Sequence, residues 1–385
     1  MTVRITWAEA SARRVERQFL ANPVSAGSPT AVAHVVAAML GAHAQVLSAA
    51  EVSVGVRAEG VTRSDVRAAL GDDGTLVKTH GPRGTVHLLA SRELGLWTGA
   101  LTAVPTGPSP HAPDVRLTEE QSVQVVAAIG DALEGRCLTL DELHDEVVAR
   151  TGPWAGDRVM PAFQDLWPRW RQVTHRAGQA GALCFGPNRG RKVTYTHPPR
   201  FDPVPGEEAL RLLVHRYLHA YGPATPQHFA KWLAAPGGWA GRLFAGLAEG
   251  GEIEEVLFEN APAWVAAGDT DFPDAPVRGV RLLPYFDAYV IAAQPRELLF
   301  PGAAYQRALA RGQAGNYPVL LVDGVAAGVW HQRRQGRRTT VTVEPLRPLT
   351  TRQERELGDR VARVGEVLEA RAELVIGEVG VGPHA

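Results

Sequence analysis

Three times along the chain, a series of helical patterns is followed by two short strand patterns joined by a turn. The first pair of strands covers residues 76–80 and 85–89, the second 182–185 and 193–195, and the third 253–258 and 263–267. In each pair the apolar residues change from helical spacing to the alternation that is typical of strands. The same order of elements in three successive segments indicates an array of three similar units.

Helices followed by a two-stranded hairpin are the order of a winged helix, which is a variant of the helix-turn-helix. We therefore expect three tandem winged-helix units. The helices are predicted from apolar residues that recur every three to four positions. They cover residues 6–20, 30–40, 48–57 and 62–71 in the first unit, 118–134, 139–150 and 156–173 in the second, and 207–221, 225–233 and 239–249 in the third.

The last part of the chain is rich in strand patterns. Strands are expected at residues 279–292, 318–322, 326–332 and 339–343, followed by a helix at 351–370. This predicts a small β-rich C-terminal domain with a closing helix, so that the fold class is α+β.

Two proline-rich segments, residues 105–113 and 197–205, separate the units. A chain of 385 residues is also too long for one ordinary core. We expect winged-helix domains with a C-terminal domain at residues 1–104, 114–197, 206–275 and 276–385.

Composition narrows the possible functions. The formal charge of −1 means that contacts with nucleic acid must come from local basic patches. Cys137 and Cys184 are far apart, which predicts neither a zinc site nor a disulfide scaffold. No signal segment and no apolar run of membrane-spanning length is present, so the expected location is cytoplasmic, with no membrane partner. Phosphate-loop, zinc-hydrolase and serine-hydrolase motifs are missing, and we predict no metal and no cofactor.

The segment His43-Ala44-Gln45 follows an apolar helical run that stops at Gly41. If the helix continued past Gly41, His43 would lie near its apolar face, and Gln45 would point about 200° away. His43 would then be a core residue. If Gly41 instead ends the helix and the segment is extended, side chains two residues apart project on one side and converge on one target. The sequence leaves both interpretations open.

Two basic hairpin turns are candidate contacts for nucleic acid. One concentrates Arg189, Arg191 and Lys192, and the other spans residues 331–338. Positive charge at a strand turn suits phosphate contact or entry into a groove. Exposed turns also collect ordinary solubilising charges, so the winged-helix order is what favours DNA. In the second turn the candidate residues are His331, Gln332, Arg333, Arg334, Arg337 and Arg338.

Four segments together resemble a known family. They are Gly41-Ala42-His43-Ala44-Gln45 leading to Val56-Arg57, the hairpin of residues 79–88, the segment 282–287, and the segment 322–330. The combination resembles the winged-helix DNA-binding superfamily that contains the AlkZ-type and YcaQ-type DNA glycosylases. The resemblance implies three tandem winged helices and a C-terminal β-barrel-like domain that form a C-shaped clamp around duplex DNA.

The resemblance also implies the site. The family's catalytic motif is Gln-x-Gln or Gln-x-Asp, and its counterparts here are His43 and Gln45, so the first position departs from the family. Members with histidine there look like the self-resistance glycosylases that accompany guanine-alkylating antibiotics of the trioxacarcin type. The matching segments add Arg57, Arg83, Thr85 and His87 as DNA contacts.

The implied reaction is hydrolysis of the N-glycosidic bond of an N7-alkylated guanine or adenine in double-stranded DNA, including bulky adducts or crosslinks. An N7-alkylated purine is cationic and already a good leaving group, so the protein need mainly orient a water and stabilise an oxocarbenium-like sugar. Gln45 could position that water, and a histidine at position 43 could accept its proton. Lys78, Lys192 and Lys231 are the only lysines, and none lies near the motif, which predicts a monofunctional glycosylase that leaves an abasic site.

Two rival functions remain open from the sequence. One is a winged-helix DNA-binding protein or transcriptional regulator that keeps the scaffold without catalysis. The other is a structural adaptor whose wings bind protein. We expect a monomeric, nucleoid-associated DNA repair or self-resistance enzyme, and release of a base from alkylated DNA discriminates it from both.

Overall fold

The computed structural model of the protein describes residues 2–25, 30–107, 109, 111–161 and 165–382, and it has a mixed α+β fold. Three of its sheets are three-stranded, and each contains one of the three predicted hairpins. The hairpins are therefore confirmed. They consist of β3 (Leu76–His80) with β4 (Val86–Ala90), β8 (Cys184–Arg189) with β9 (Lys192–Thr196), and β10 (Ile253–Phe258) with β11 (Ala261–Ala266).

The first unit contains the four predicted helices, with bounds that differ from the predicted ones by one to three residues. Thr6 and Thr62 begin two of these helices with capping boxes, in which the threonine hydroxyl and the acidic residue three positions later satisfy each other's backbone N–H groups. Strand β2 joins the hairpin in the order β2-β4-β3. The elements are β1 (Arg4–Ile5), α1 (Trp7–Arg17), α2 (Ala31–Ala38), β2 (Ala42–His43), α3 (Leu47–Gly55), α4 (Arg63–Leu70), η1 (Pro82–Gly84), η2 (Ser91–Glu93) and α5 (Leu94–Ala103).

The second unit has a three-stranded sheet in the order β5-β9-β8. The predicted helix over residues 156–173 is wrong. Pro161 and Pro168 lack the N–H that a helix needs there, and the segment forms short strands and a 3-10 helix instead. Its residues 162–164 lie outside the described part. The elements are α6 (Glu119–Leu133), β5 (Cys137–Thr139), α7 (Leu140–Thr151), α8 (Pro153–Gly156), β6 (Arg158–Pro161), β7 (Leu166–Pro168), η3 (Arg169–Val173) and α9 (Thr174–Gln179).

The sheet of the third unit includes a strand from the start of the chain. β1 pairs in parallel with β10, so its sheet has the order β1-β10-β11. The unit's helices share an apolar core with α5 of the first unit, where Trp232 lies beside both Trp97 and Tyr217. The first and third units are thus packed together through a common core. The helices are α10 (Gly206–Tyr221), α11 (Pro226–Leu233) and α12 (Gly237–Glu249).

The C-terminal unit is a five-stranded sheet in the order β12-β13-β14-β15-β16. The predicted strand over 279–292 is wrong beyond Leu283, because Pro284 cannot continue the ladder and Asp287 caps a helix. Strand β16, which pairs in parallel with β15, was not predicted. The elements are β12 (Val280–Leu283), α13 (Ala288–Ala292), α14 (Arg296–Leu299), α15 (Ala303–Arg307), β13 (Val319–Val322), β14 (Val325–Gln335), β15 (Arg338–Pro345), α16 (Thr351–Val367) and β16 (Arg371–Ile376).

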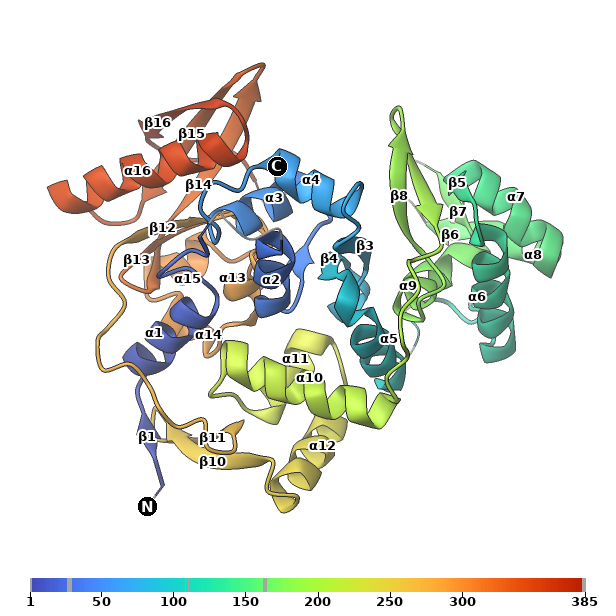
Figure 1. Ribbon diagram of the computed structural model, residues 1–385, viewed down its shortest axis with the longest axis horizontal. Helices are drawn as coiled ribbons and strands as arrows, with labels where there is room; N and C mark the ends of the chain where they lie inside the picture. Colours follow the sequence, from blue (N-terminus) through green and yellow to red (C-terminus); the bar gives the residue numbers. More distant parts are fainter. Residues whose placement is uncertain (1, 26–29, 108, 110, 162–164, 383–385) are drawn as a thin grey trace.

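Figure 1 shows the first unit in the middle of the molecule, with the C-terminal sheet and the second unit on opposite sides of it. Helix α16 covers the sheet and also packs on α3, where Gly55 permits close approach. A Cβ at Gly55 would lie 2.4 Å from Val367 Cγ2. Arg363 stabilises the same junction by donating hydrogen bonds to the carbonyl oxygens of Gly55, Ala58 and Val61. The C-terminal unit is therefore fixed against the helix that follows His43 and Gln45.

Candidate active site and nucleic-acid interface

The segment after helix α2 contains a two-residue strand, β2, at Ala42–His43, with bends at Gly41 and Gln45. Helix α2 ends at Ala38, and Leu40 and Gly41 follow with φ of +56° and +93°, a conformation that side chains disfavour. His43 then pairs with His87 of β4, and the Ala44 N–H donates to Val86 O at 2.8 Å. Ala42 and Ala44 pack in the apolar core of the first unit. The helix does not continue past Gly41, so the interpretation as a continuous helix is wrong, whereas convergence of His43 and Gln45 on one target stays a prediction.

His43 and Gln45 differ in exposure. Gln45 is exposed, whereas only 7% of His43 is. The His43 ring stacks on Phe286 with ring centroids 4.4 Å apart and an interplanar angle of 26°. His87 approaches the His43 ring edge-on, with a centroid distance of 5.0 Å. A cavity of about 10 Å³ beside His43 has room for roughly one water molecule.

The turn of the first hairpin is not an exposed wing. Arg83 Nη1 donates to Trp232 O at 2.7 Å, and burial lowers the pKa of Arg83 to about 10, so the side chain stays charged at neutral pH. Thr85 is half-buried, and its hydroxyl donates to Pro82 O. His87 is only 4% exposed and lies against the His43 ring, so its predicted contact with DNA stays a prediction.

The predicted DNA contact of Arg57 is wrong. Its guanidinium is fully buried and forms a bidentate ion pair with Asp287, in which both hydrogen bonds are 2.8 Å long. A buried guanidinium needs such a partner, since an unpaired charge is costly inside a protein. Arg57 therefore connects the end of α3 to the loop before α13 and is inaccessible to DNA.

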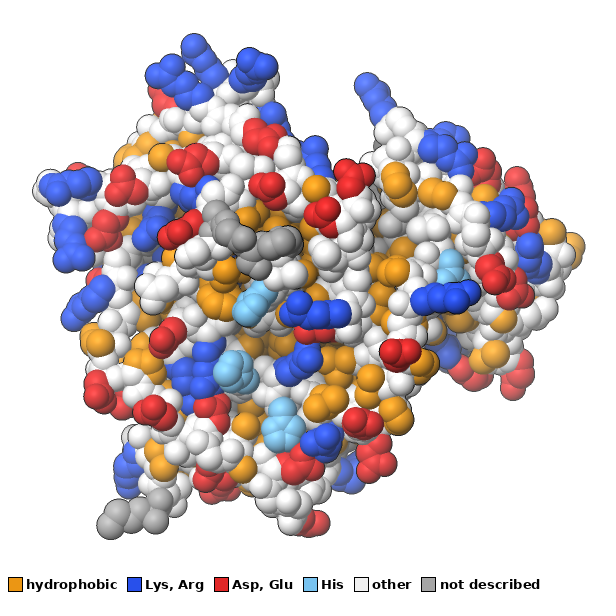
Figure 2. Space-filling model, in the orientation of Figure 1, with side chains coloured by type: hydrophobic (Ala, Val, Ile, Leu, Met, Phe, Trp, Pro, Cys, Tyr) orange, Lys and Arg blue, Asp and Glu red, His pale blue; other side chains and the backbone are white. Residues whose placement is uncertain are grey.

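The basic hairpin of the C-terminal unit is exposed. Residues 333–338, at the tip of β14 and β15, are all exposed, while His331 and Gln332 are half-buried below the tip. Burial lowers the pKa of His331. Arg371 of the unpredicted strand β16 pairs in register with Arg338 and adds a further charge. Lys and Arg side chains gather at this tip in Figure 2. Across the described ranges, no ion pair involves Arg333, Arg334, Arg337 or Arg338.

The basic turn of the second hairpin is partly neutralised. Arg189 pairs with Glu142 at 2.9 Å, and Lys192 pairs with Asp141 at 2.9 Å, both on the first turn of α7. The pKa of Glu142 is lowered to about 2, chiefly by its backbone hydrogen bond with Thr139 and also by Arg189. Arg191 is exposed and forms no ion pair with any residue that the structure describes. Of the three predicted contacts, Arg191 is the most available to a phosphate.

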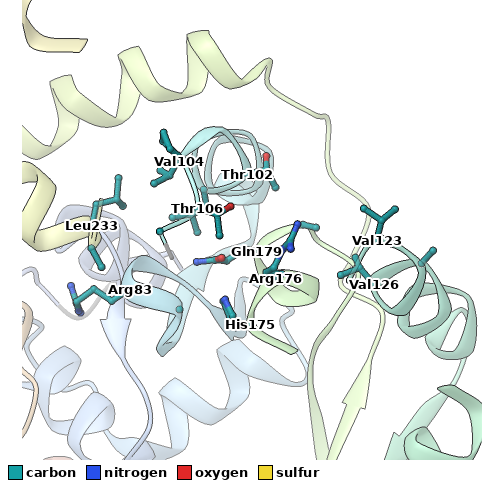
Figure 3. A pocket seen from close by; sticks show the side chains of 17 residues that line it. Arg83, Thr102, Val104, Thr106, Val123, Val126, His175, Arg176, Gln179 and Leu233 are labelled. Atoms are coloured by element: carbon teal, nitrogen blue, oxygen red, sulfur yellow. The ribbon is translucent and has the colours of Figure 1, made fainter. Parts of the chain in front are cut away.

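A larger cavity of about 500 Å³ opens where the first, second and third units meet. Arg83, His175, Arg176 and Gln179 line it together with apolar residues of α5, α6 and α11 (Figure 3). Arg83 lines both this cavity and the small cavity beside His43. The hairpin turn that carries Arg83 therefore lies at a junction between units, next to the candidate site.

Phe286 and Asp287 were missed as site residues by sequence reasoning. Both belong to a matching segment of the family resemblance, but they lie more than two hundred positions from His43, and no local pattern connects them. The pattern that could have indicated them in the sequence is an acidic residue directly after two aromatic residues. Among the described residues, no group of three or more His, Cys, Asp or Glu side chains could hold a metal ion. No helix within the described ranges is long and apolar enough to cross a membrane.

Comparisons with known proteins agree with this geometry. A model of the family described as "DNA glycosylase AlkZ-like" matches residues 36–367. The chain is 30% identical over 339 residues to an interstrand DNA cross-link repair glycosylase of Streptomyces sahachiroi, covering 85% of this chain and 88% of that protein. The solved structure of Streptomyces sahachiroi DNA glycosylase AlkZ superposes with a TM-score of 0.77 at 27% identity, covering 97% of this chain and all of that one. The family model, the relative and the shared fold define a DNA glycosylase. The chain belongs to the AlkZ-like DNA glycosylase family.

Proposed function

We propose that this glycosylase hydrolyses the N-glycosidic bond of N7-alkylated purines in duplex DNA and leaves an abasic site, with His43 and Gln45 as its catalytic residues. One observation carries the proposal. His43, in the short strand β2, and Gln45, in the bend that follows it, are separated by Ala44, which packs in the apolar core together with Ala42. The two polar side chains can then converge on one reacting atom.

The substrate's own chemistry reduces what the protein must supply. Alkylation at N7 makes the purine cationic, so the C1′–N9 bond breaks with the electron pair moving to the base, which leaves as a neutral molecule. The sugar becomes an oxocarbenium-like cation that a water then attacks. Positioning of that water and stabilisation of the cation are the principal tasks.

His43 and Gln45 divide these tasks according to their chemistry. The exposed Gln45 amide can orient the attacking water by accepting one of its protons in a hydrogen bond. The imidazole of His43 can take the proton that the water loses as it bonds to C1′. The small cavity beside His43 gives room for roughly one water molecule that could carry this proton onward.

The lysines support a reaction without strand cleavage. Lyase chemistry needs an amine that attacks C1′ and forms a Schiff base. No lysine is among the described residues that line the cavity beside His43. Lys78 is half-buried with its ammonium 4.8 Å from the centre of the Phe185 ring, and Lys192 is paired with Asp141.

We interpret the three helix-and-hairpin units as winged helices that form a clamp with the C-terminal sheet around the duplex. The exposed, unpaired arginines at the tip of β14 and β15 support phosphate contact by that hairpin, and Arg191 supports contact by the second. Thr85 and Arg83 stay proposed contacts from the turn beside His43. We further propose that the enzyme acts as a monomer and is nucleoid-associated.

The lesion is proposed to be bulky. The relative from Streptomyces sahachiroi is described as an interstrand cross-link repair glycosylase, so crosslinks and large N7-guanine adducts are the substrates to test first, in repair or in self-resistance. A bulky adduct resists extrusion from the helix, and we therefore propose recognition without base flipping.

The test is incubation of the protein with duplex DNA that carries one N7-alkylguanine, followed by alkaline cleavage at abasic sites. We expect release of the base and a strand break only after alkali. Breaks before alkali would contradict the absence of lyase chemistry. Intact binding with no release from simple, bulky or crosslinked N7 adducts would contradict the proposed substrate class.

A further inference from the structure

Phe286 forms one wall around His43, in an unusual backbone conformation. Its φ is +56°, a region that few residues other than glycine occupy. Such a conformation persists only where the surroundings hold it. Here the Phe286 N–H donates to Gly315 O at 2.9 Å, and the aromatic ring stacks on the His43 imidazole. The ring position is therefore determined by the structure of its loop.

The next residue, Asp287, is what holds that loop. Its buried carboxylate accepts hydrogen bonds from Arg57 Nη1 and Nη2, from Ser53 Oγ at 2.6 Å, and from the N–H of Tyr289 at 3.0 Å. A movement of the loop would leave a buried carboxylate and a buried guanidinium unpaired. The network thus permits one position of Asp287 and of the Phe286 backbone next to it.

The donors in this network come from the segment that carries the catalytic candidates. Ser53 lies in α3, which begins two residues after Gln45, and Arg57 follows the end of the same helix. Arg57 Nη1 also donates to Ser53 O at 2.8 Å. The network therefore ties the segment of His43 and Gln45 to the loop of Phe286, although these segments are far apart in sequence.

Stability alone does not explain a fully buried ion pair, because well-packed apolar residues are often as stable in its place. Fixing one arrangement of two segments is the better-attested role of such polar groups. We infer that Ser53, Arg57 and Asp287 are positioning residues that hold Phe286 against His43, and that Phe286 keeps the His43 imidazole in a single orientation during the reaction. This inference rests on the proposed catalytic role of His43.

The consequence for catalysis is geometric. A proton acceptor works only when its lone pair points at the proton that it removes. Between the face of Phe286 and the edge of His87, the imidazole has little freedom to rotate. Without the Phe286 ring, the imidazole would lose the face that it stacks on, and the rate of the chemical step would fall while the affinity for DNA would not.

One experiment tests the positioning without any substrate. NMR spectra are recorded of the protein labelled at its histidine rings, with the His43 signal assigned by its loss in His43→Gln. In wild type we expect one His43 signal, shifted by the ring current of Phe286. Phe286→Leu removes this shift. Asp287→Asn, which weakens the network that holds the loop, is expected to move or broaden the same signal, whereas unchanged His43 signals in both variants would overturn the inference.

A second experiment measures the catalytic effect as single-turnover base release at saturating protein. Phe286→Leu is expected to lower the rate constant by about tenfold to a hundredfold, with Phe286→Tyr close to wild type. Phe185→Leu is the matched control, since Phe185 is also half-buried beside a histidine, His80, outside the site. Its rate constant should equal that of wild type.

A double-mutant cycle separates positioning from a general structural effect. In the His43→Ala background, Phe286→Leu should lower the rate no further, because its effect acts through His43. Additive losses would overturn the inference and leave the proposed function intact. A wild-type rate in His43→Ala would instead overturn the proposed role of His43, and the inference with it.

Discussion

His43 and His87 meet edge to face, with ring planes at 65°, because they are register partners on the antiparallel strands β2 and β4. His87 Nδ1 donates to Thr85 O at 2.8 Å, so the neutral ring carries its proton on Nδ1. Burial, above all, and then the nearby His43 hold the pKa of His87 well below its ordinary value. His87 therefore stays neutral at physiological pH, and no positive charge from it opposes proton transfer to His43.

The buried pair of Arg57 and Asp287 gives a prediction on stability. Arg57→Met leaves the Asp287 carboxylate buried without its main partner, and we expect the free energy of unfolding to fall by about 3–5 kcal/mol. The double variant Arg57→Met with Asp287→Leu should recover most of this loss in urea denaturation. Equal destabilisation in the single and double variants would contradict the ion-pair account. The salt dependence of DNA binding by Arg57→Met should match that of wild type, because Arg57 does not reach DNA.

The exposed hairpin of β14 and β15 gives a prediction on DNA affinity. Replacing Arg333 and Arg334 by alanine removes two phosphate contacts, so the slope of log affinity against log salt should become shallower by about 1.8. Fluorescence anisotropy on undamaged duplex measures this slope. The matched control replaces Arg136 and Arg150, which both pair with Glu146, and should leave the slope unchanged. Equal slopes in both double variants would place the basic hairpin away from DNA.

Acid stability should depend on His80, which packs between the first and second units. Burial and the neighbouring His175 lower the pKa of His80 to about 4, so the unfolded chain binds its proton more readily. Above pH ~6.5 His80 is neutral in both the folded and the unfolded chain, so it does not affect the free energy of unfolding. This free energy falls as the pH drops from ~6.5 towards 4, by at most about 3 kcal/mol for this group. His80→Phe should flatten that part of the urea-denaturation profile. An equally steep profile in the variant would show that His80 does not titrate in this range.

The junction of α3 and α16 gives a prediction on packing. Gly55→Ala places a methyl group 2.4 Å from Val367 Cγ2, which should destabilise the protein by about 1–3 kcal/mol. Adding Val367→Ala should restore part of this loss although it removes a core side chain. The control is Gly358→Ala, in the helix α16 that also carries Val367. A Cβ at Gly358 would meet nothing within 4 Å, so this substitution should stabilise the protein by about 0.5–1 kcal/mol. If the losses of Gly55→Ala and Val367→Ala simply add in the double variant, the new methyl group does not clash with Val367. Helices α3 and α16 would then have moved apart to make room for it, against this prediction.

Local patterns were sufficient to predict most of the helices and all three hairpins. Threonine caps and helical spacing determine where α1, α6 and α7 begin, and these signals lie within a few residues of each other. The mistaken helix at 156–173 came from apolar spacing that outweighed Pro161 and Pro168. Strands β1 and β16 were missed because both are short and each pairs in parallel with a strand that is not its neighbour in a hairpin. Such a pairing gives no local turn pattern in the sequence.

The candidate site was only half predictable. His43 and Gln45 could be named because they interrupt an apolar run, and Gly41 supports the extended conformation. Phe286 and Asp287 could not be placed beside them, since the contact depends on how the C-terminal unit packs on α3. The same packing explains the error at Arg57, which was predicted as a DNA contact from a matching segment of the family resemblance and is instead paired with Asp287.

The central claim is that His43 and Gln45 act on the glycosidic bond, and single-turnover release of N7-alkylguanine from duplex DNA tests it most directly. His43→Ala and Gln45→Ala should each lower the rate constant by about a hundredfold or more, while the dissociation constant for the duplex stays within about twofold of wild type. Base release at the wild-type rate in both variants would contradict the account.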